Sequence, residues 1–169
     1  MTSLEQVLES RDKRAARQRA LLAEWPGSVL ICLTVQLPGP EKRNARSLLI
    51  GGAALSALLN TFGSILTHVQ VKDLETGFEA YIVLSLDPLL TKQLCCRIED
   101  THPLGRLMDI DVLYGDGRIL GRSDAGLPPR KCLLCDNEVR LCMRSGNHTR
   151  EELLARIDAM LADYTGEHG

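Results

Sequence analysis

Two aspartates separated by one residue are best placed in this sequence to do chemistry. Asp109 and Asp111 lie in the stretch 102–113 (HPLGRLMDIDVL), whose second half alternates as a strand does. In an extended strand both carboxylates point to one face, about 6.5–7 Å apart along the chain. Their mutual repulsion favours a divalent cation as partner, and oxygen ligands suit Mg²⁺. The alternative is an edge strand with a polar face open to water.

Positive residues near this strand could complete a site for a polyphosphate. Gly105 and Arg106 precede it and offer a close backbone approach and a fixed cation. The cations downstream are Arg118, Arg122, Arg130 and Lys131. Phosphoryl and nucleotidyl transfer use such a metal-held polyphosphate clamped by arginines. A third carboxylate would complete the metal site, and the sequence does not choose among Asp73, Asp87, Glu99 and Asp124.

His102 opens the same stretch and is a candidate general base. Pro103 follows it and holds it in an extended conformation. From there an imidazole could accept a proton or contact a phosphate. A surface or capping histidine is the plainer interpretation.

Three cysteines and a histidine near the C-terminus have a spacing that fits a metal. Cys132 and Cys135 form a Cys-x-x-Cys pair, and Cys142 and His148 follow it. Three thiolates and an imidazole suit a tetrahedral structural Zn²⁺. Reduced buried thiols are one alternative. Redox chemistry is another, although such a pair usually follows a strand and opens a helix, and that context is absent here.

Helices and short strands must position these residues. Helices are predicted at about 3–24, 41–60, 87–99, 138–143 and from 149, and strands at 28–37, 65–74, 78–86, 107–113 and 118–121. The pattern predicts an α+β fold with a mixed, mainly antiparallel sheet and flanking helices. Residues 1–169 are expected to form a single domain, on which a Cys-rich and helical segment, about 130–165, could be an appendage.

Composition narrows the classes of function. A net charge of −2 and a pI of about 6.1 do not indicate general binding to nucleic acid. We find no apolar run long enough for a bilayer and no secretory signal pattern, so we expect a cytoplasmic protein without a membrane partner. The basic middle of the first helix, Arg11 to Arg19, is either a solvated face or a docking surface for phosphates or an acidic partner.

Several blocks together resemble one known family. They are Ser10-Arg11-Asp12, 37–42 (LPGPEK), 102–112 (HPLGRLMDIDV), 127–135 (LPPRKCLLC), Cys142-Met143-Arg144 and His148. From about residue 10 to 163 the chain resembles the holo-[acyl-carrier-protein] synthases of citrate lyase. These enzymes are also called apo-citrate lyase phosphoribosyl-dephospho-CoA transferases.

The resemblance implies a reaction and a nucleotidyltransferase-like site. The 2′-(5″-phosphoribosyl)-3′-dephospho-CoA group would pass from its 5″-triphosphate precursor to a serine of the acyl carrier protein (γ subunit) of citrate lyase, with release of pyrophosphate. Asp109 and Asp111 would bind Mg²⁺. Arg106, Arg130 and Lys131 would contact phosphates, and an aspartate or His102 would accept the serine proton. The alternatives are a general metal-dependent nucleotidyltransferase and a non-catalytic adaptor that binds the acyl carrier protein.

Overall fold

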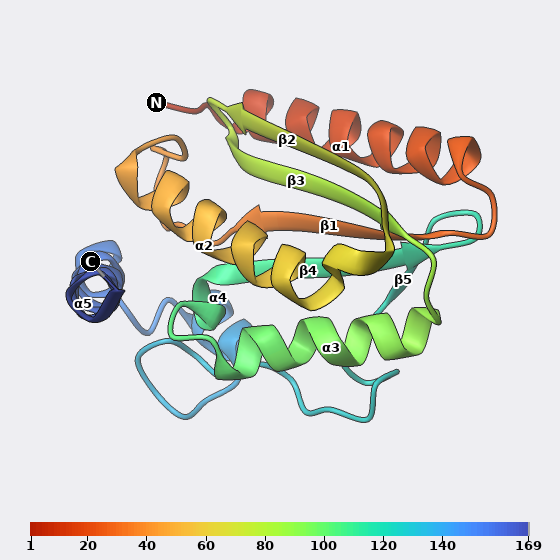
Figure 1. The fold of residues 1–169 in the computed structure, drawn as a ribbon. Coiled ribbons are helices and arrows are strands. Elements are labelled where there is room, and N and C mark those ends of the chain that lie inside the picture. Colours follow the sequence, from red (N-terminus) through yellow and green to blue (C-terminus); the bar gives the residue numbers. More distant parts are fainter. Residues whose placement is uncertain (169) are drawn as a thin grey trace.

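A five-stranded antiparallel sheet forms the centre of the molecule (Figure 1). The structure is a computed structural model and describes residues 1–168. Its strands are β1 (Val29–Val35), β2 (Leu66–Leu74), β3 (Gly77–Leu84), β4 (Met108–Tyr114) and β5 (Arg118–Leu120), in the order β2-β3-β1-β4-β5. The predicted α+β class is confirmed, but the expected mixed sheet is wrong. The connection from β1 to β2 and the connection from β3 to β4 each skip one position in the sheet, so every pair of neighbouring strands is antiparallel.

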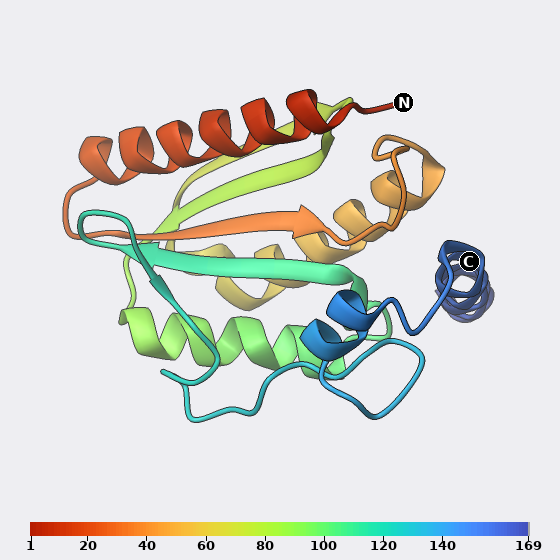
Figure 2. The ribbon, with the colours of Figure 1, turned by 180° about the vertical axis from the view of Figure 1, so that it is seen from behind.

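Helices cover the two faces of the sheet unequally. Helix α1 (Leu4–Glu24) lies on one face, and α2 (Ala45–Phe62) and α3 (Pro88–Thr101) lie on the other (Figure 1). The short helix α4 (Val139–Ser145) and α5 (Arg150–His168) complete the chain. Two 3₁₀ turns, η1 (Gly63–Ile65) and η2 (Gly105–Leu107), precede β2 and β4. Seen from behind, α1 runs along the β2–β3 side and leaves β4 in view (Figure 2).

Capping side chains set the helix boundaries. Ser3 caps α1, and its hydroxyl oxygen accepts a hydrogen bond from the Gln6 amide at 3.1 Å. The second helix begins at Ala45 rather than at the predicted residue 41, because the Asn44 side chain accepts from the Ser47 amide and ends the preceding loop. The capping-box pattern at the start of α5 is present in both directions, through Thr149 and Glu152.

The larger hydrophobic core lies between the sheet and helices α2 and α3. Alternate residues of the central strands enter it: Val29, Ile31, Leu33, Met108, Ile110 and Val112. Ile157 of α5 is buried in the same core and anchors the C-terminal helix. A smaller core lies under the end of α1 and comprises Leu21, Leu22, Leu30, Cys32, Tyr81, Val83 and Leu113.

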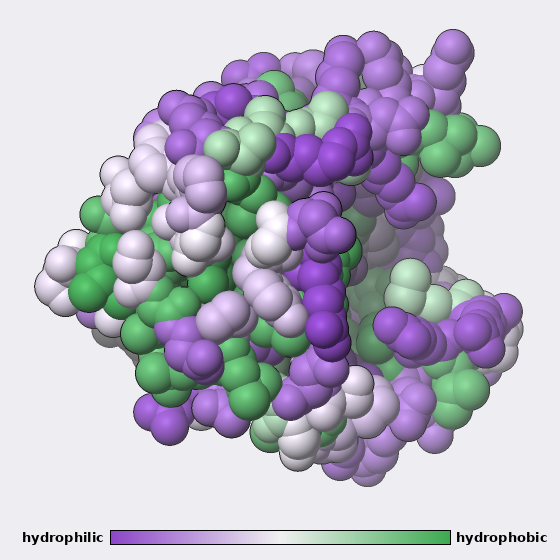
Figure 3. Space-filling view, turned by 90° about the vertical axis from the view of Figure 1, so that its right-hand side faces the viewer, coloured by the Kyte–Doolittle hydropathy of each residue, from purple (hydrophilic) through white to green (hydrophobic). Residues whose placement is uncertain are grey.

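Helix α2 corrects one expectation from the sequence. Together with the turn after it, Ala45–Ile65 is long and apolar enough to cross a membrane by length and composition. Helices in the core of soluble proteins pass the same test, and the stripe of α2 through Ile50, Leu58 and Phe62 is buried in the larger core. A Cβ at Gly51 would lie 2.5 Å from the Phe78 ring, so this glycine allows the close packing of α2. Hydrophobic residues gather on one side of the surface in Figure 3, beside a hollow.

Candidate functional site

The two aspartates lie on the sheet face that α1 partly covers, as the alternation predicts. Met108, Ile110 and Val112 are buried in the larger core, whereas Asp109 and Asp111 are half-buried. The opposite face of β4 therefore carries the carboxylates away from the apolar packing. One strand serves both the core and the candidate site.

Strand register aligns each aspartate with residues that are distant in the sequence. Asp109 lies opposite Thr34, and Thr34 lies opposite Glu79 on β3. The next row across the same strands is Asp111, Cys32 and Tyr81. Because neighbouring strands are about 4.8 Å apart, the Cα atoms of Glu79 and Asp109 are about 10 Å apart.

Glu79 is a buried carboxylate that the sequence reasoning missed. Its side chain accepts a hydrogen bond from Arg14 Nε at 3.1 Å and another from the Tyr81 hydroxyl at 2.7 Å. Only 5% of the Glu79 side chain is exposed, so the Arg14 charge largely balances a desolvated carboxylate. The signal in the sequence was a single charge inside the otherwise apolar or aromatic run 78–84 (FEAYIVL).

The electrostatics of the aspartate pair favour a cation. The pKa of Asp111 rises to about 6, first because the carboxyl group is buried and then because Asp109 lies beside it. Lys92 and Arg14 act in the opposite direction on this pKa. Asp109 Oδ2 accepts a hydrogen bond from Gln36 Nε2 at 3.1 Å. A divalent ion bound here would stabilise the charged form of Asp111, which burial and the neighbouring Asp109 disfavour.

A pocket of about 320 Å³ adjoins this face. It lies between the first half of α1 and the β2–β3 hairpin, and its lining includes Ser10, Lys13, Arg14, Lys72, Glu79 and Tyr81. Glu79 and Tyr81 belong to the pocket lining and also to the two rows that contain the aspartates. The basic middle of α1 is thus not a uniform solvated face: Arg14 and Arg17 turn towards the sheet, where Arg17 Nε donates to Gln70 at 2.8 Å.

At the start of β4, side chains rather than a neighbouring strand form hydrogen bonds with the backbone groups of the outer edge. β5 pairs with β4 from Val112 to Tyr114 and not before. At Ile110 the backbone N–H donates to the Glu99 carboxylate at 3.0 Å, and the carbonyl oxygen accepts from Lys92 Nζ at 3.0 Å. Arg130 donates to the Met108 carbonyl oxygen at 2.7 Å. This edge is therefore a buried polar network with its backbone groups paired.

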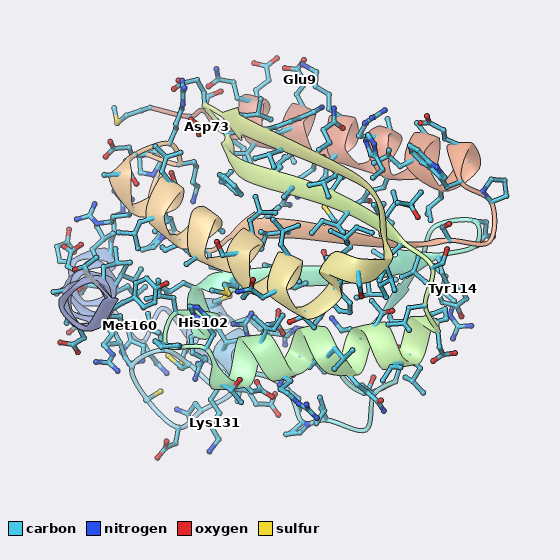
Figure 4. All side chains as sticks on the ribbon, in the orientation of Figure 1. Glu9, Asp73, His102, Tyr114, Lys131 and Met160 are labelled. Carbon is cyan, nitrogen blue, oxygen red and sulfur yellow. The ribbon has the colours of Figure 1, made fainter. Side chains whose placement is uncertain are left out.

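The predicted phosphate ligands gather at this edge and in the loop beyond it. Arg130 also donates to the Gly105 carbonyl oxygen at 2.8 Å, so its guanidinium holds backbone. Gly105 is buried, and a Cβ there would lie 2.2 Å from the Glu99 carbonyl oxygen, which explains the glycine by packing against α3. Burial, followed by the charge of Arg130, lowers the pKa of the half-buried Arg106. Exposed Lys131 lies at the outer edge of the molecule (Figure 4).

The structure does not bring these four residues onto the aspartates. Within residues 1–168, no hydrogen bond or ion pair given by the structure joins Gly105, Arg106, Arg130 or Lys131 to the side chain of Asp109 or Asp111. The cations whose charges act on Asp111 are Lys92 and Arg14, and Arg14 comes from the first helix of the chain.

His102 lies at the C-terminal end of α3. Its amide donates to the Ile98 carbonyl oxygen, and its Nδ1 accepts from the Leu104 amide at 3.0 Å. The ring is 5.6 Å from the Tyr164 ring of α5, and the labelled side chain lies on the α5 side of the molecule (Figure 4). His102 therefore caps α3 and packs against α5 in this structure, and its role as a general base stays a prediction.

The four carboxylates considered for a third metal ligand have other partners. Asp87 caps α3, and Asp73 accepts from Arg43 Nε at 3.0 Å. Asp124 accepts a hydrogen bond from the Gly121 amide at 2.7 Å, and Glu99 accepts one from the Ile110 amide at the edge of β4. Glu79 is the buried carboxylate that shares the face of the aspartates.

Cys132, Cys135, Cys142 and His148 come together as their spacing predicts. One ligand atom from each lies within 4.8 Å of the others, and the set could hold a metal such as zinc. The Sγ atoms of Cys135 and Cys142 are 3.4 Å apart. Burial opposes ionisation of Cys132, but hydrogen bonds from the backbone and neighbouring thiols outweigh it and lower its pKa to about 7. His148 Nε2 is buried without a hydrogen-bond partner among the described residues, as a metal ligand would be.

Comparison with known proteins identifies the family of this chain. The family model described as apo-citrate lyase phosphoribosyl-dephospho-CoA transferase (CitX) matches residues 2–164. A probable transferase of that name from Vibrio cholerae serotype O1 is 38% identical over 170 residues, covering 96% of this chain and 93% of the relative. The Escherichia coli O1:K1 transferase is 38% identical over 164 residues, covering 95% and 89%.

A longer relative matches almost the whole chain. Protein CitXG of Haemophilus influenzae is 35% identical over an alignment of 173 residues, and the match covers 98% of this chain but 37% of the relative. The family model and the two relatives of similar length cover the strands, the aspartates and the cysteine cluster together. The chain therefore belongs to the apo-citrate lyase phosphoribosyl-dephospho-CoA transferase family.

Proposed function

We propose that this transferase joins phosphoribosyl-dephospho-CoA to a serine of the apo-acyl carrier protein of citrate lyase. The donor is the 5″-triphosphate. The serine oxygen forms a bond to the α-phosphorus, the bond from that phosphorus to the leaving oxygen breaks, and pyrophosphate departs with the electron pair. Family membership supports the transfer to apo-citrate lyase. The observation that carries the chemistry is the pair Asp109 and Asp111 on the sheet face that also carries the pocket residues Glu79 and Tyr81.

The residues at this face fit a hard divalent ion. The two carboxylates provide oxygen ligands. Burial and the neighbouring Asp109 disfavour the charged form of Asp111, which a bound cation would stabilise. Thr34 and Gln36 add polar groups beside Asp109. Asp109 and Asp111 would hold the ion. Bound Mg²⁺ would neutralise charge on the polyphosphate and orient its oxygens. Arg14 and the cations of the pocket would contact the donor phosphates.

The serine proton passes to a group at the same face in this proposal. Of the two hypothesised bases, the aspartates lie at the pocket side of the sheet. His102 contacts the end of α3 and α5 instead. We therefore place the proton on an aspartate carboxylate.

The cysteine cluster has a structural role in this proposal. Its four ligands all come from the protein, so a tetrahedral Zn²⁺ there would have no open position for a substrate. Transfer would then depend on Mg²⁺ at the aspartates and not on the metal at the cysteines.

One experiment separates this function from its rivals. Purified apo-carrier protein is incubated with the enzyme, Mg²⁺ and either the triphosphate donor or ATP, and the carrier is weighed by intact mass spectrometry. We expect the mass of phosphoribosyl-dephospho-CoA to be added only from its triphosphate, with one pyrophosphate released for each carrier modified. Addition of adenylate from ATP would indicate a general nucleotidyltransferase. Carrier binding without any mass change would indicate an adaptor.

A further inference from the structure

Arg130 ties the cysteine loop to the strand that carries the aspartates. Its guanidinium donates to the carbonyl oxygens of Met108 and Gly105 at 2.7 and 2.8 Å, and it lies 3.5 Å from the Glu99 carboxylate. Because β5 does not reach this part of β4, the carbonyl of Met108 has no strand partner on that side. Arg130 therefore supplies, from a loop, a hydrogen bond that a neighbouring strand would otherwise make.

The position of Arg130 matters because its surroundings are buried. Glu99 and Lys92, which pair the Ile110 backbone, are 4% and 5% exposed. Loss of Arg130 would leave the carbonyl oxygens of Met108 and Gly105 without the hydrogen bonds from its guanidinium, whereas Glu99 would keep Arg122 Nη1 at 2.9 Å. Arg130 therefore holds the backbone at the start of β4.

The loop after Arg130 is closed by few backbone contacts. Lys131 and Glu138 form an isolated bridge, and the Cys132 amide donates to the Asn137 carbonyl oxygen at 2.7 Å. The Val139 amide donates to the Arg130 carbonyl oxygen at 3.0 Å. These bonds pair the two ends of the loop and reach the first residue of α4, Val139, but they do not join the loop to α5.

The cysteine cluster makes that connection. Cys132 and Cys135 come from the loop, Cys142 from α4, and His148 from the residues just before α5. Zinc–sulfur bonds of about 2.3 Å place sulfur atoms of a tetrahedral site about 3.8 Å apart, close to the 3.4 Å between Cys135 and Cys142. His148 Nδ1 lies 3.9 Å from the Glu152 carboxylate, which would orient the ring with Nε2 towards the sulfurs.

We propose that a thiophilic divalent metal of the zinc class, bound by Cys132, Cys135, Cys142 and His148, fixes Arg130 against β4. The bound metal thereby holds the strand of Asp109 and Asp111 in place. The inference rests on the proposed function only in taking β4 as the reacting strand. The test measures metal content and backbone protection, so it can fail while the transfer assignment stands, and the reverse also holds.

The first arm of the experiment establishes the metal. The full chain, purified with a reductant and without added metal, is analysed for bound metals. It is then dialysed against phenanthroline and titrated with Co²⁺. We expect close to one zinc per chain and, for the cobalt form, the intense visible absorption of a tetrahedral thiolate site. Absence of a thiophilic metal, or a disulfide between Cys135 and Cys142 in the purified protein, overturns the proposal.

The second arm tests the link to β4 by hydrogen exchange. Arg130→Met keeps the four ligands and removes the clamp. We expect it to retain its zinc but to lose protection about tenfold or more at the Met108 and Ile110 amides, with the β2–β3 hairpin unchanged. Arg140→Met removes an exposed charge from α4 and serves as the matched control, expected to match the parent protein.

The outcomes of the second arm decide the proposal in either direction. Metal removal from the parent protein should reproduce the β4 effect of Arg130→Met and add loss of protection across 131–139. Should the metal-free protein unfold as a whole, the zinc-loaded Arg130→Met protein still reports on β4. Protection of Met108 and Ile110 equal to that of the parent in this variant overturns the inference.

Discussion

The two candidate metal sites of this protein differ in how they are built and in what they leave open. The aspartate face is assembled from β3, β1, β4 and α1, and its carboxylates do not complete a coordination sphere. The cysteine cluster comes from residues 132–148 alone and supplies four ligands. An incomplete oxygen site suits a reaction, whereas a closed sulfur site suits a structural metal. In the function we propose, substrate oxygens would complete the coordination of an ion at the aspartates.

The largest expected effect is on the aspartate side of this comparison. Asp109→Asn removes a charge at the proposed ion and should lower the transfer rate about 10³-fold or more, with the fold and the zinc content unchanged. Asp116→Asn makes the same chemical change at an exposed turn and should transfer as the parent does. Intact mass of the carrier, circular dichroism and metal analysis check these outcomes. Transfer at the parent rate by Asp109→Asn would contradict the proposed roles.

Selective chelation should separate the two sites in one protein. EDTA applied briefly is expected to abolish transfer, because it strips the weakly held ion at the aspartates, while the zinc at the thiolates remains. Adding back Mg²⁺ should restore transfer fully. Restoration of transfer by Zn²⁺ alone would contradict the assignment of a reacting Mg²⁺ site at the aspartates and a structural metal at the cysteines.

A smaller effect is expected for Arg14 of α1, the partner of Glu79. Arg14→Gln leaves the buried Glu79 without its charged partner and removes a proposed phosphate contact. It should raise the KM for the triphosphate donor about tenfold and lower the free energy of unfolding by about 1–3 kcal/mol. Arg19→Gln, exposed on the same helix, is the control. Steady-state kinetics and urea unfolding provide the measurements. An unchanged KM with lowered stability would assign Arg14 a structural role only.

The smallest effect concerns the residue next to the cysteine cluster. Glu152→Gln keeps a side-chain acceptor for the Thr149 amide but removes the charge facing His148 Nδ1. Zinc affinity should fall about tenfold, with little change in transfer at saturating zinc. Glu151→Gln is the neighbouring control and should keep the parent affinity. Competition with a chromophoric chelator measures both, and equal affinities would show that Glu152 does not orient the histidine.

Local patterns predicted the parts of this protein that depend on nearby residues. Alternation along 107–113 placed Asp109 and Asp111 on one face, and the Cys-x-x-Cys spacing with Cys142 and His148 identified the cluster. The side-chain period of a strand and the reach of a short loop are properties of the chain itself. The predicted helices and strands are also present, and their boundaries differ from the predicted ones by a few residues.

Such local patterns could not predict the roles of Glu79, Arg14 and Arg130. Glu79 shares the face of the aspartates only because β3 and β4 both pair with β1, and Arg14 contacts Glu79 because α1 packs across β3. Arg130 looked like a phosphate ligand in the sequence, and in the fold its guanidinium binds the β4 backbone.

Residue types at short spacing were enough to predict the α+β class, the two aspartates on one strand face and the candidate zinc ligands, and the motif blocks along the chain were enough to indicate the family. The tertiary structure decided the strand order and which cations reach the aspartate face. It also decided which carboxylate shares that face. The physical reason is that helix packing and strand register bring together residues that are far apart in the sequence: Arg14 and Glu79 are 65 positions apart, and Thr34 and Asp109 are 75 positions apart. No local periodicity encodes such a separation.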